Sequence, residues 1–359
     1  MKISIIGTVG VPAQYGGFET LVENILDHTE GDVCYQVYCS GKTARKNRVK
    51  QYKNARLIYL PFSANGAQSI IYDMVSIFHA LHTSDELLVF GTSGCIILPV
   101  VRVFSKKKII VNIDGLEHRR GKWNKFAKWF LRISERAAIR FANTIITDNV
   151  AIQQYVKEKY GKDSEMIEYG GDHVLVDGDD SVLNKWNLTK QNFALKVCRI
   201  EPENNIHTIL DAFQQMPNET LVIIGNWNKN KYGKKLRQQY GHLENYRLLD
   251  AIYDMRTLNG LRKNCRYYVH GHSAGGTNPS LVEAMNLGLP ILAFDVIYNR
   301  ETTENKAFYF QNRESLVHQT SCFSEDALDT NASAMKEIAQ RRYQWNAIVK
   351  KYEDLFKVK

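Results

Sequence analysis

Short runs of apolar and β-branched residues alternate along the whole chain with longer stretches in which apolar residues recur at the spacing of a helix. This alternation is typical of βαβ units and of a mostly parallel sheet. The runs form two sets that are separated near residue 170. They predict strands at residues 3–6, 33–39, 56–60, 86–90, 109–113 and 144–147 in the first set, and at 193–197, 220–224, 246–248, 267–269 and 290–293 in the second.

The two sets predict two doubly wound α/β domains, each beginning with an apolar strand. An acidic, glycine-containing stretch from Gly170 to Asp180 lies between them and is typical of a linker. We expect one domain over residues 1–169, a second over 170–340, and a C-terminal helix over 341–359 that packs back toward the first. Such sheets bind ligands outside the carboxyl ends of their strands, so two facing domains predict a ligand in a central cleft.

The composition agrees with a globular protein and narrows its functional class. Hydrophobic residues make up 44% of the 359, and charged residues 24%. Six cysteines without a C-x-x-C pair disfavour a zinc site or a disulfide framework and suit the reducing cytoplasm. No apolar run approaches the roughly 18 residues of a membrane span, so we expect a cytoplasmic protein, soluble or attached to a surface.

The net charge of +9 fits a phosphorylated ligand, an anionic membrane or nucleic acid. The sequence contains neither a zinc-finger spacing nor an RNP-like aromatic motif. We therefore expect no nucleic-acid partner.

The first candidate motif is the glycine-containing stretch of residues 7–20, which follows the first strand and opens into a helix. Glycines let backbone amides approach a ligand, and a helix N-terminus favours an anion. The spacing is neither G-x-G-x-x-G nor a P-loop. A phosphate or sugar loop and a tight structural turn both remain open interpretations.

The second motif, residues 271–285, runs from a strand through a Gly-Gly-Thr turn into a helix that begins at Pro279. Amides from Gly276 to Ser280, Pro279 excepted, would point at a bound phosphate, and Glu283 could accept hydrogen bonds from a ribose. A simple helix cap at Thr277 or Asn278 leaves the glycines and Glu283 unexplained.

The third motif is Arg199-Ile200-Glu201-Pro202-Glu203-Asn204-Asn205, which follows the first strand of the second set. An arginine at the carboxyl end of a strand is well suited to bind a diphosphate with both arms of its guanidinium. The alternative is an ion pair between Arg199 and Glu201 or Glu203.

Together these motifs resemble glycosyltransferase family 4, whose members are retaining enzymes of the GT-B fold, with two Rossmann-like domains that face a cleft. Residues 12–20, 112–117 and 275–285 are similar to a narrower group, the bacterial β-1,4-rhamnosyltransferases of cell-surface polysaccharide synthesis. The resemblance extends from Met1 into the C-terminal helix. It implies transfer of L-rhamnose from dTDP-L-rhamnose to a saccharide carried on a polyprenyl diphosphate, without a metal or cofactor.

The resemblance also implies roles for individual residues. Arg199 would neutralise the leaving diphosphate, and Glu283 would hold the ribose. Two positions depart from the family pattern: Gly275 replaces the earlier of two paired glutamates, and Asn204 replaces a lysine. The donor would be bound by Gly16, Gly17, Asn204, Asn205, Ile252, Tyr253, Gly275, Gly276, Thr277, Asn278, Ser280 and Glu283.

Three further residues are candidates for the acceptor side of the reaction. Asp114 and Glu117 follow a predicted strand, and either could bind an acceptor hydroxyl, although a purely structural role stays open. His118 stands where the rhamnosyltransferase pattern more often has tryptophan.

Residues 122–136 predict a helix with tryptophan and phenylalanine on one face and lysine and arginine on the adjacent face. This pattern is typical of a helix that lies on an anionic membrane, here the inner face of the cell membrane. The alternative is a helix that packs its aromatic side chains into the core.

Other functions stay open at this stage. A glycosyltransferase that uses UDP-glucose or UDP-galactose is the nearest alternative. From other classes come a nucleotide-sugar epimerase or oxidoreductase, which the missing G-x-G-x-x-G disfavours, and a non-catalytic module that binds nucleotide sugars.

Overall fold

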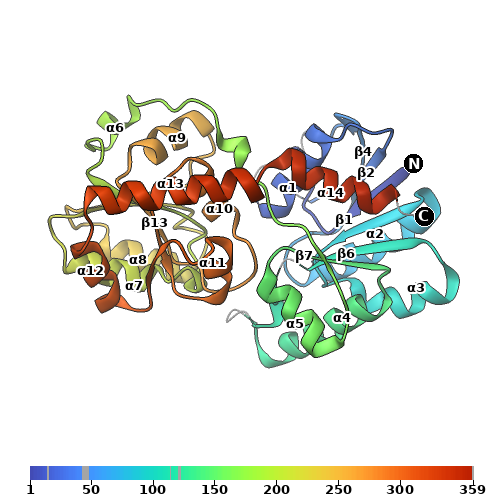
Figure 1. Ribbon diagram of the computed structural model, residues 1–359. Coiled ribbons are helices and arrows are strands. Elements are labelled where there is room, and N and C mark those ends of the chain that lie inside the picture. Colours follow the sequence, from blue (N-terminus) through green and yellow to red (C-terminus); the bar gives the residue numbers. More distant parts are fainter. Residues whose placement is uncertain (14–15, 43–47, 114, 120–122, 358–359) are drawn as a thin grey trace. The chain divides into compact units, whose positions relative to one another are not determined.

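The computed structural model describes residues 1–13, 16–42, 48–113, 115–119 and 123–357. Contacts divide the chain into two compact units, Met1–Tyr169 with Trp345–Lys359, and Gly170–Gln344. Each unit contains a mostly parallel sheet with helices packed against it, as Figure 1 shows. The expected α/β class with two Rossmann-like sheets is confirmed.

In the described part of the first unit, the sheet has the order β3-β4-β2-β1-β5-β6-β7-β8. All of its neighbours pair in parallel except β3 and β4. The strands are β1 (Lys2–Ile6), β2 (Cys34–Ser40), β3 (Gln51–Tyr52), β4 (Ala55–Leu60), β5 (Glu86–Phe90), β6 (Lys108–Ile113), β7 (Thr144–Thr147) and β8 (Glu165–Met166).

Helices connect these strands and cover the sheet. The helix side chains that face the sheet are buried against strands that are apolar almost throughout. The helices of the first unit are α1 (Gly17–His28), α2 (Gln68–Thr83), α3 (Leu98–Phe104), α4 (Lys125–Phe141), α5 (Val150–Tyr160) and α14 (Trp345–Lys357), with the short turns η1 (Cys95–Ile97) and η2 (Glu117–Arg119).

The second unit has the strand order β11-β10-β9-β12-β13-β14, and all of these neighbouring strands pair in parallel. The strands are β9 (Phe193–Val197), β10 (Thr220–Ile224), β11 (Tyr246–Leu249), β12 (Tyr267–His270), β13 (Ile291–Phe294) and β14 (Phe308–Phe310). The helices are α6 (Val182–Lys185), α7 (Ile206–Gln214), α8 (Lys231–Tyr240), α9 (Met255–Asn264), α10 (Pro279–Asn286), α11 (Ile297–Thr302), α12 (Arg313–Ser321) and α13 (Glu325–Arg342), with η3 (Asp172–Val174) and η4 (Pro202–Asn204).

The expected strands are present, and three further strands, β3, β8 and β14, were not predicted. Each contains only two or three residues. Such short segments show no measurable alternation, and they join a sheet because a neighbouring edge offers hydrogen bonds.

The C-terminal segment differs from the single helix expected over residues 341–359. Helix α13 continues to Arg342, whose side chain pairs with Glu304, and the buried Tyr343 donates its hydroxyl to Thr302 O at 2.8 Å. These contacts hold the chain on the second unit. Helix α14 begins only at Trp345 and lies beside α1 in the first unit, where the hydroxyl of its buried Tyr352 accepts from Asn112 Nδ2 at 2.8 Å.

The stretch of residues 170–180 is not a free linker, as the sequence pattern suggested. Asn259 Nδ2 donates to the carbonyl oxygens of Val174 and Val176 at 2.7 and 3.0 Å. A side-chain carbon at Gly171 would lie 2.6 Å from Val282 O, so this backbone runs directly along α10. Its glycines serve close packing against the second unit rather than flexibility.

A buried carboxyl group in α2 leads to a prediction about pH. Ser93 Oγ donates to Asp73 Oδ2 at 3.0 Å, and burial raises the pKa of Asp73 to about 7 although that hydrogen bond lowers it. In an unfolded chain the pKa of aspartate is about 3.9. The folded state therefore holds the proton more tightly, and stability should fall as pH rises from about 4 to about 7.

Asp73→Asn keeps an acceptor for Ser93 without the charge. We expect the melting temperature of the variant minus that of wild type to be larger at pH 8 than at pH 5, because only wild type loses stability as Asp73 ionises. Thermal unfolding at both pH values would check this, with the exposed Asp329→Asn as the control that follows wild type. Parallel behaviour of Asp73→Asn and wild type would contradict it.

Candidate functional site

The central strand β9 of the second unit determines where its candidate site lies. It pairs in parallel with β10 on one side and with β12 on the other. The chain therefore leaves the carboxyl end of β9 in one direction and that of β12 in the other. Ligands of doubly wound sheets bind at this kind of switch point. Two of the three sequence motifs, the loops after β9 and β12, meet there.

Hydrogen bonds tie these two loops together. Asn204 Nδ2 donates to Arg199 O at 2.8 Å, and Asn204 Oδ1 lies 3.1 Å from His272 Nδ1. Asn205, in the left-handed conformation with φ of 49°, donates its Nδ2 to Gly271 O at 2.9 Å. Both predicted donor-binding asparagines thus use their side-chain amides to join the loops.

The side chain of Arg199 is exposed at this junction. Within the described part of the chain it forms an ion pair with neither Glu201 nor Glu203, which contradicts the structural alternative. Its guanidinium is therefore available for an anionic ligand.

The Gly-Gly-Thr turn presents backbone N–H groups to the same region. Gly275 has φ of 101°, a conformation that favours glycine. Within the described residues, no acceptor is seen for the N–H groups of Gly275, Gly276 and Asn278. Together with the N-terminus of α10 they form an arrangement that suits an anion.

One member of the predicted phosphate-binding set has another function. Asn278 caps α10, and its Oδ1 accepts from both the backbone N–H and the hydroxyl of Ser280, at 3.1 and 2.9 Å. The Ser280 amide is therefore used within the cap and does not point at a ligand, as the sequence had suggested. The motif therefore contains both a helix cap, at Asn278, and a separate glycine turn before it.

Glu283 lies in α10 and interacts with two residues that were not predicted. Its Oε2 forms an ion pair with the 2% exposed Arg262, and its Oε1 lies 3.5 Å from His173 Nε2. Burial alone would raise the pKa of Glu283, but the charges of Arg262 and His173 lower it below its ordinary value. The sequence does contain a signal for a buried role of Arg262. It follows Leu258 by four residues, which places it on the same, buried side of α9.

Ile252 and Tyr253 lie in the turn between β11 and α9. Tyr253 is 64% exposed, and the next residue, Asp254, caps α9 by accepting from Thr257 N at 2.8 Å. The cap positions an aromatic surface at the carboxyl edge of the same sheet.

In the first unit, the glycine stretch after β1 is shaped by a buried glutamate. Glu19 Oε1 accepts from Val9 N at 2.7 Å, and a side chain at Gly16 would lie 1.9 Å from Glu19 Oε2. Gly16 has φ of 139° and precedes Gly17, the first residue of α1. Glycine at 16 is thus explained by packing alone, which supports the structural-turn interpretation for this position.

The acceptor candidates also belong to the first unit. Asp114 lies outside the described residues. Glu117 Oε2 accepts from Trp123 Nε1 at 3.2 Å. His118 is 5% exposed, and its Nδ1 lies 2.9 Å from Oε2 of the buried Glu135.

Glu135 is the centre of this cluster. Its Oε1 accepts from the hydroxyls of Tyr155 and Tyr160 at 2.6 and 2.7 Å. Burial alone would raise the pKa of Glu135, but His118 and the two tyrosines lower it to about 2. The carboxylate therefore stays ionised and fixes the orientation of the imidazole.

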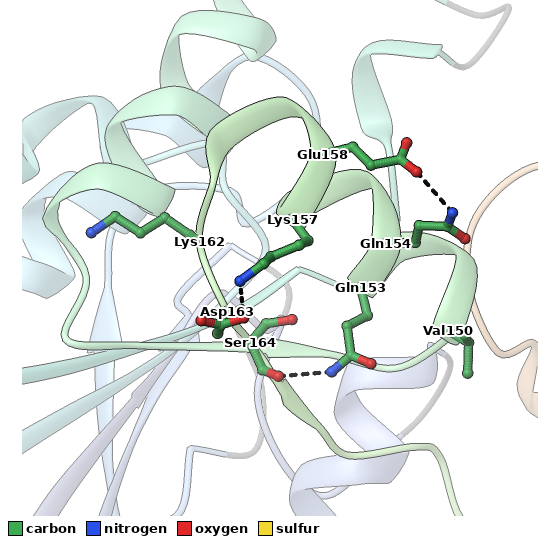
Figure 2. A pocket seen from close by; sticks show the side chains of 8 residues that line it. All are labelled: Val150, Gln153, Gln154, Lys157, Glu158, Lys162, Asp163 and Ser164. Atoms are coloured by element: carbon green, nitrogen blue, oxygen red, sulfur yellow. Dashed lines mark hydrogen bonds and ion pairs between the residues drawn. The ribbon is translucent and has the colours of Figure 1, made fainter.

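A separate cavity of about 490 Å³ lies along α5 and contains none of the predicted site residues. Figure 2 shows that its polar side chains bond to one another: Lys157 with Asp163, Gln154 with Glu158, and Gln153 with Ser164 O. Because these polar groups already have partners, a ligand would form few new hydrogen bonds in this cavity.

Family comparisons divide the chain at nearly the same place as its contacts. Residues 1–172 match a domain of unknown function, DUF1972, and residues 180–342 match glycosyl transferases group 1.

Solved structures match over the whole chain. Sucrose-phosphate synthase from Thermosynechococcus elongatus is 16% identical, with a TM-score of 0.83 over 99% of this chain and 98% of that one. HepE from Anabaena in complex with UDP is 18% identical, with a TM-score of 0.75 over 99% of both chains. WaaG, a glycosyltransferase involved in lipopolysaccharide biosynthesis, is 12% identical, with a TM-score of 0.74 over 100% of both. These likenesses establish the fold as GT-B.

The buried pair of Arg262 and Glu283 gives a stability prediction. Arg262→Met leaves a carboxylate without its partner, which typically costs about 3–5 kcal/mol. The double variant Arg262→Met/Glu283→Gln should recover most of that loss, because no uncompensated charge remains. Denaturant unfolding of the single and double variants would measure the coupling.

Arg237→Met is the matched control, since its ion pair with Asp250 is largely exposed and should contribute at most about 1 kcal/mol. Equal losses from Arg262→Met and Arg237→Met would show that the buried pair is not coupled.

Proposed function

We propose that this chain is a glycosyltransferase and that it catalyses one specific reaction; its fold is GT-B, and its residues 180–342 match glycosyl transferases group 1. The reaction is transfer of L-rhamnose from dTDP-L-rhamnose to a lipid-linked saccharide, with retention at the anomeric carbon. The observation that carries the donor site is that the loop of the exposed Arg199 is hydrogen-bonded, through Asn204 and Asn205, to the loop that leads into the glycine turn. The choice of rhamnose rests on the resemblance of residues 12–20, 112–117 and 275–285.

Departure of the nucleoside diphosphate is the demanding step in glycosyl transfer, because negative charge grows on the leaving phosphate. Arg199 would supply a cation that pairs with both phosphate oxygens. The N–H groups of Gly275, Gly276 and Asn278, at the N-terminus of α10, would supply fixed dipoles. Groups that are already oriented stabilise such charge without reorganising during the reaction.

The rest of the nucleotide would extend along the same edge of the sheet. Glu283 stays ionised beside Arg262 and can only accept hydrogen bonds, so it suits the hydroxyls of a ribose. Ile252 and the exposed Tyr253 would line the base. HepE has been solved with UDP and with UDP and glucose, which keeps UDP-glucose or UDP-galactose as the alternative donor.

The acceptor would be bound by the first unit, through Glu117 and His118. Because Glu135 holds one imidazole nitrogen of His118, the other would be presented in a defined direction. A fixed imidazole can bind a sugar hydroxyl without losing much side-chain entropy.

We also propose that the first unit attaches to an anionic membrane at the inner face of the cell membrane, through α4. Phe126 and Trp129 are 72% and 57% exposed, so they do not pack into the core as the alternative required. Lys125 and Arg132 are exposed on the same helix. Lys122, which belongs to the same sequence pattern, lies outside the described residues. No described helix is long and apolar enough to span a bilayer.

Helix α3 packs against α4, where Arg102 Nε donates to Phe141 O at 2.7 Å, and it carries further exposed apolar side chains in the same unit. Its Val103 and Phe104 are 76% and 79% exposed. Apolar side chains next to lysine and arginine match the boundary between acyl chains and anionic headgroups.

A panel of nucleotide sugars tests the reaction. With dTDP-L-rhamnose and a lipid-linked saccharide we expect release of dTDP and a product of retained configuration, measured by nucleotide assay and NMR. Arg199→Ala should lose about 30- to 1,000-fold in rate, since the leaving group loses a fixed cation. Arg313→Ala, an exposed arginine paired with Glu314, should match wild type.

A preference for UDP-glucose or UDP-galactose would replace rhamnose while keeping the class of reaction. Binding of NAD without turnover of any nucleotide sugar would favour the oxidoreductase or epimerase alternative. An Arg199→Ala rate within about threefold of wild type would remove Arg199 from the site.

Vesicle binding tests the membrane surface. Reversing Lys125, Lys128 and Arg132 to glutamate should release the protein from anionic vesicles, because each basic residue near such a surface contributes about 1 kcal/mol. Donor hydrolysis by water and the melting temperature should change little, whereas transfer to a lipid-linked acceptor should drop. Added salt should weaken wild-type binding in the same way.

The matched control reverses Lys231, Lys234 and Lys235 of α8, which changes the net charge equally in the other unit. If both triple variants bind vesicles as wild type does, or both lose binding equally, the interaction is not specific to α4.

A further inference from the structure

Lys196 is a buried lysine that has no partner among the residues that the structure describes. It lies in the central strand β9 and is 1% exposed. In the described part of the chain its ammonium makes neither an ion pair nor a hydrogen bond. A buried charge in this condition is costly, and proteins normally pair it or bind an ion against it.

The ammonium lies at the carboxyl end of the sheet, under the two loops of the donor site. A side-chain carbon at Gly271 would be 3.1 Å from Lys196 Nζ and 2.3 Å from Asn204 O. Any residue other than glycine at 271 would therefore collide with the loop and crowd the ammonium. The backbone of the second motif passes directly over the charge.

Lys196 and Arg199 act on the same neighbourhood. Burial raises the pKa of the Cys198 thiol, whereas both Lys196 and Arg199 lower it. Both side chains are therefore close to one sulfur atom, Lys196 from the end of β9 and Arg199 from the loop that follows it.

The nearby His270 adds no second charge. His270 is fully buried, and burial, Lys196 and His272 all lower its pKa, so its imidazole is neutral. Asn204, which occupies the junction of the loops, is also neutral. The side chain of Lys196 thus brings a basic group to the base of this site.

We propose that Lys196 is the second cation of the diphosphate site. Arg199 binds the nucleoside diphosphate from the exposed side, and the ammonium of Lys196 attracts its negative charge from beneath the loops. The proposal rests on the proposed donor site and adds a residue to it. A bound diphosphate supplies the anion that the buried ammonium lacks, and the attraction is strong because little water separates them.

Calorimetric titration with inorganic pyrophosphate, dTDP and thymidine tests this. Lys196→Met should weaken pyrophosphate and dTDP about 10- to 100-fold, the loss typical of one charge-assisted contact. Affinity for thymidine, which has no phosphate, should not change. The melting temperature should stay the same or rise, because a buried unpaired charge is replaced by an apolar side chain of similar length.

A purely structural lysine would show the opposite pattern, with lower stability and unchanged pyrophosphate affinity. Lys196→Gln, neutral but polar, gives the same test if the methionine variant does not fold. Lys231→Met, at an exposed position of the same unit, is the control for net charge and should bind as wild type does.

The outcomes separate this proposal from the proposed function. Wild-type pyrophosphate affinity in Lys196→Met, with a loss in Arg199→Ala, would overturn the role of Lys196 and leave the donor site in place. If wild type binds neither dTDP nor pyrophosphate, both the donor site and the role of Lys196 are overturned.

Discussion

The parallel pairing of β9 with both β10 and β12 is the constraint on which the candidate site depends. A strand that starts a doubly wound sheet has neighbours that the chain reaches in opposite directions, so the loops at its carboxyl end diverge. Here these are the loop of Arg199 and, from β12, the loop of Gly275. Their divergence leaves a place for a ligand, and the side chains of Asn204 and Asn205 keep the loops in register around it. Without this strand order, the same motifs would be unrelated turns.

In the second unit, the buried charge of Glu283 is paired, whereas the exposed charge of Arg199 is available to a ligand. The acidic Glu283 is satisfied by the buried Arg262, while Arg199 remains unpaired in the described part of the chain. The helix N-terminus of α10 and the glycine N–H groups have the same sign of potential as Arg199. In the proposed function this arrangement would attract a diphosphate before any sugar chemistry occurs. Burying a basic side chain such as Lys196 lowers the stability of the fold.

The first unit uses buried carboxylates differently. Glu19 shapes the glycine turn after β1, and Glu135 orients His118 with the help of two tyrosines. These acids hold loops and side chains in position from inside the fold. The aromatic side chains of α4, by contrast, remain at the surface beside basic residues. A folded domain rarely exposes aromatic side chains together unless a membrane or a protein partner covers them.

The sequence alone determined the α/β class and the two sheets, because apolar strands and glycine turns are encoded locally, whereas the donor role of the three motifs stays a prediction. The sequence could not reveal β3, β8 and β14, which are too short to show a pattern, or the division of the C-terminal segment between α13 and α14. Only the tertiary structure decided that Ser280 is used by a cap, that Glu283 pairs with Arg262, and that Lys196 is buried beneath the loops. The physical reason is the same in each case: partners far apart in the chain meet only when the sheet brings their strands together.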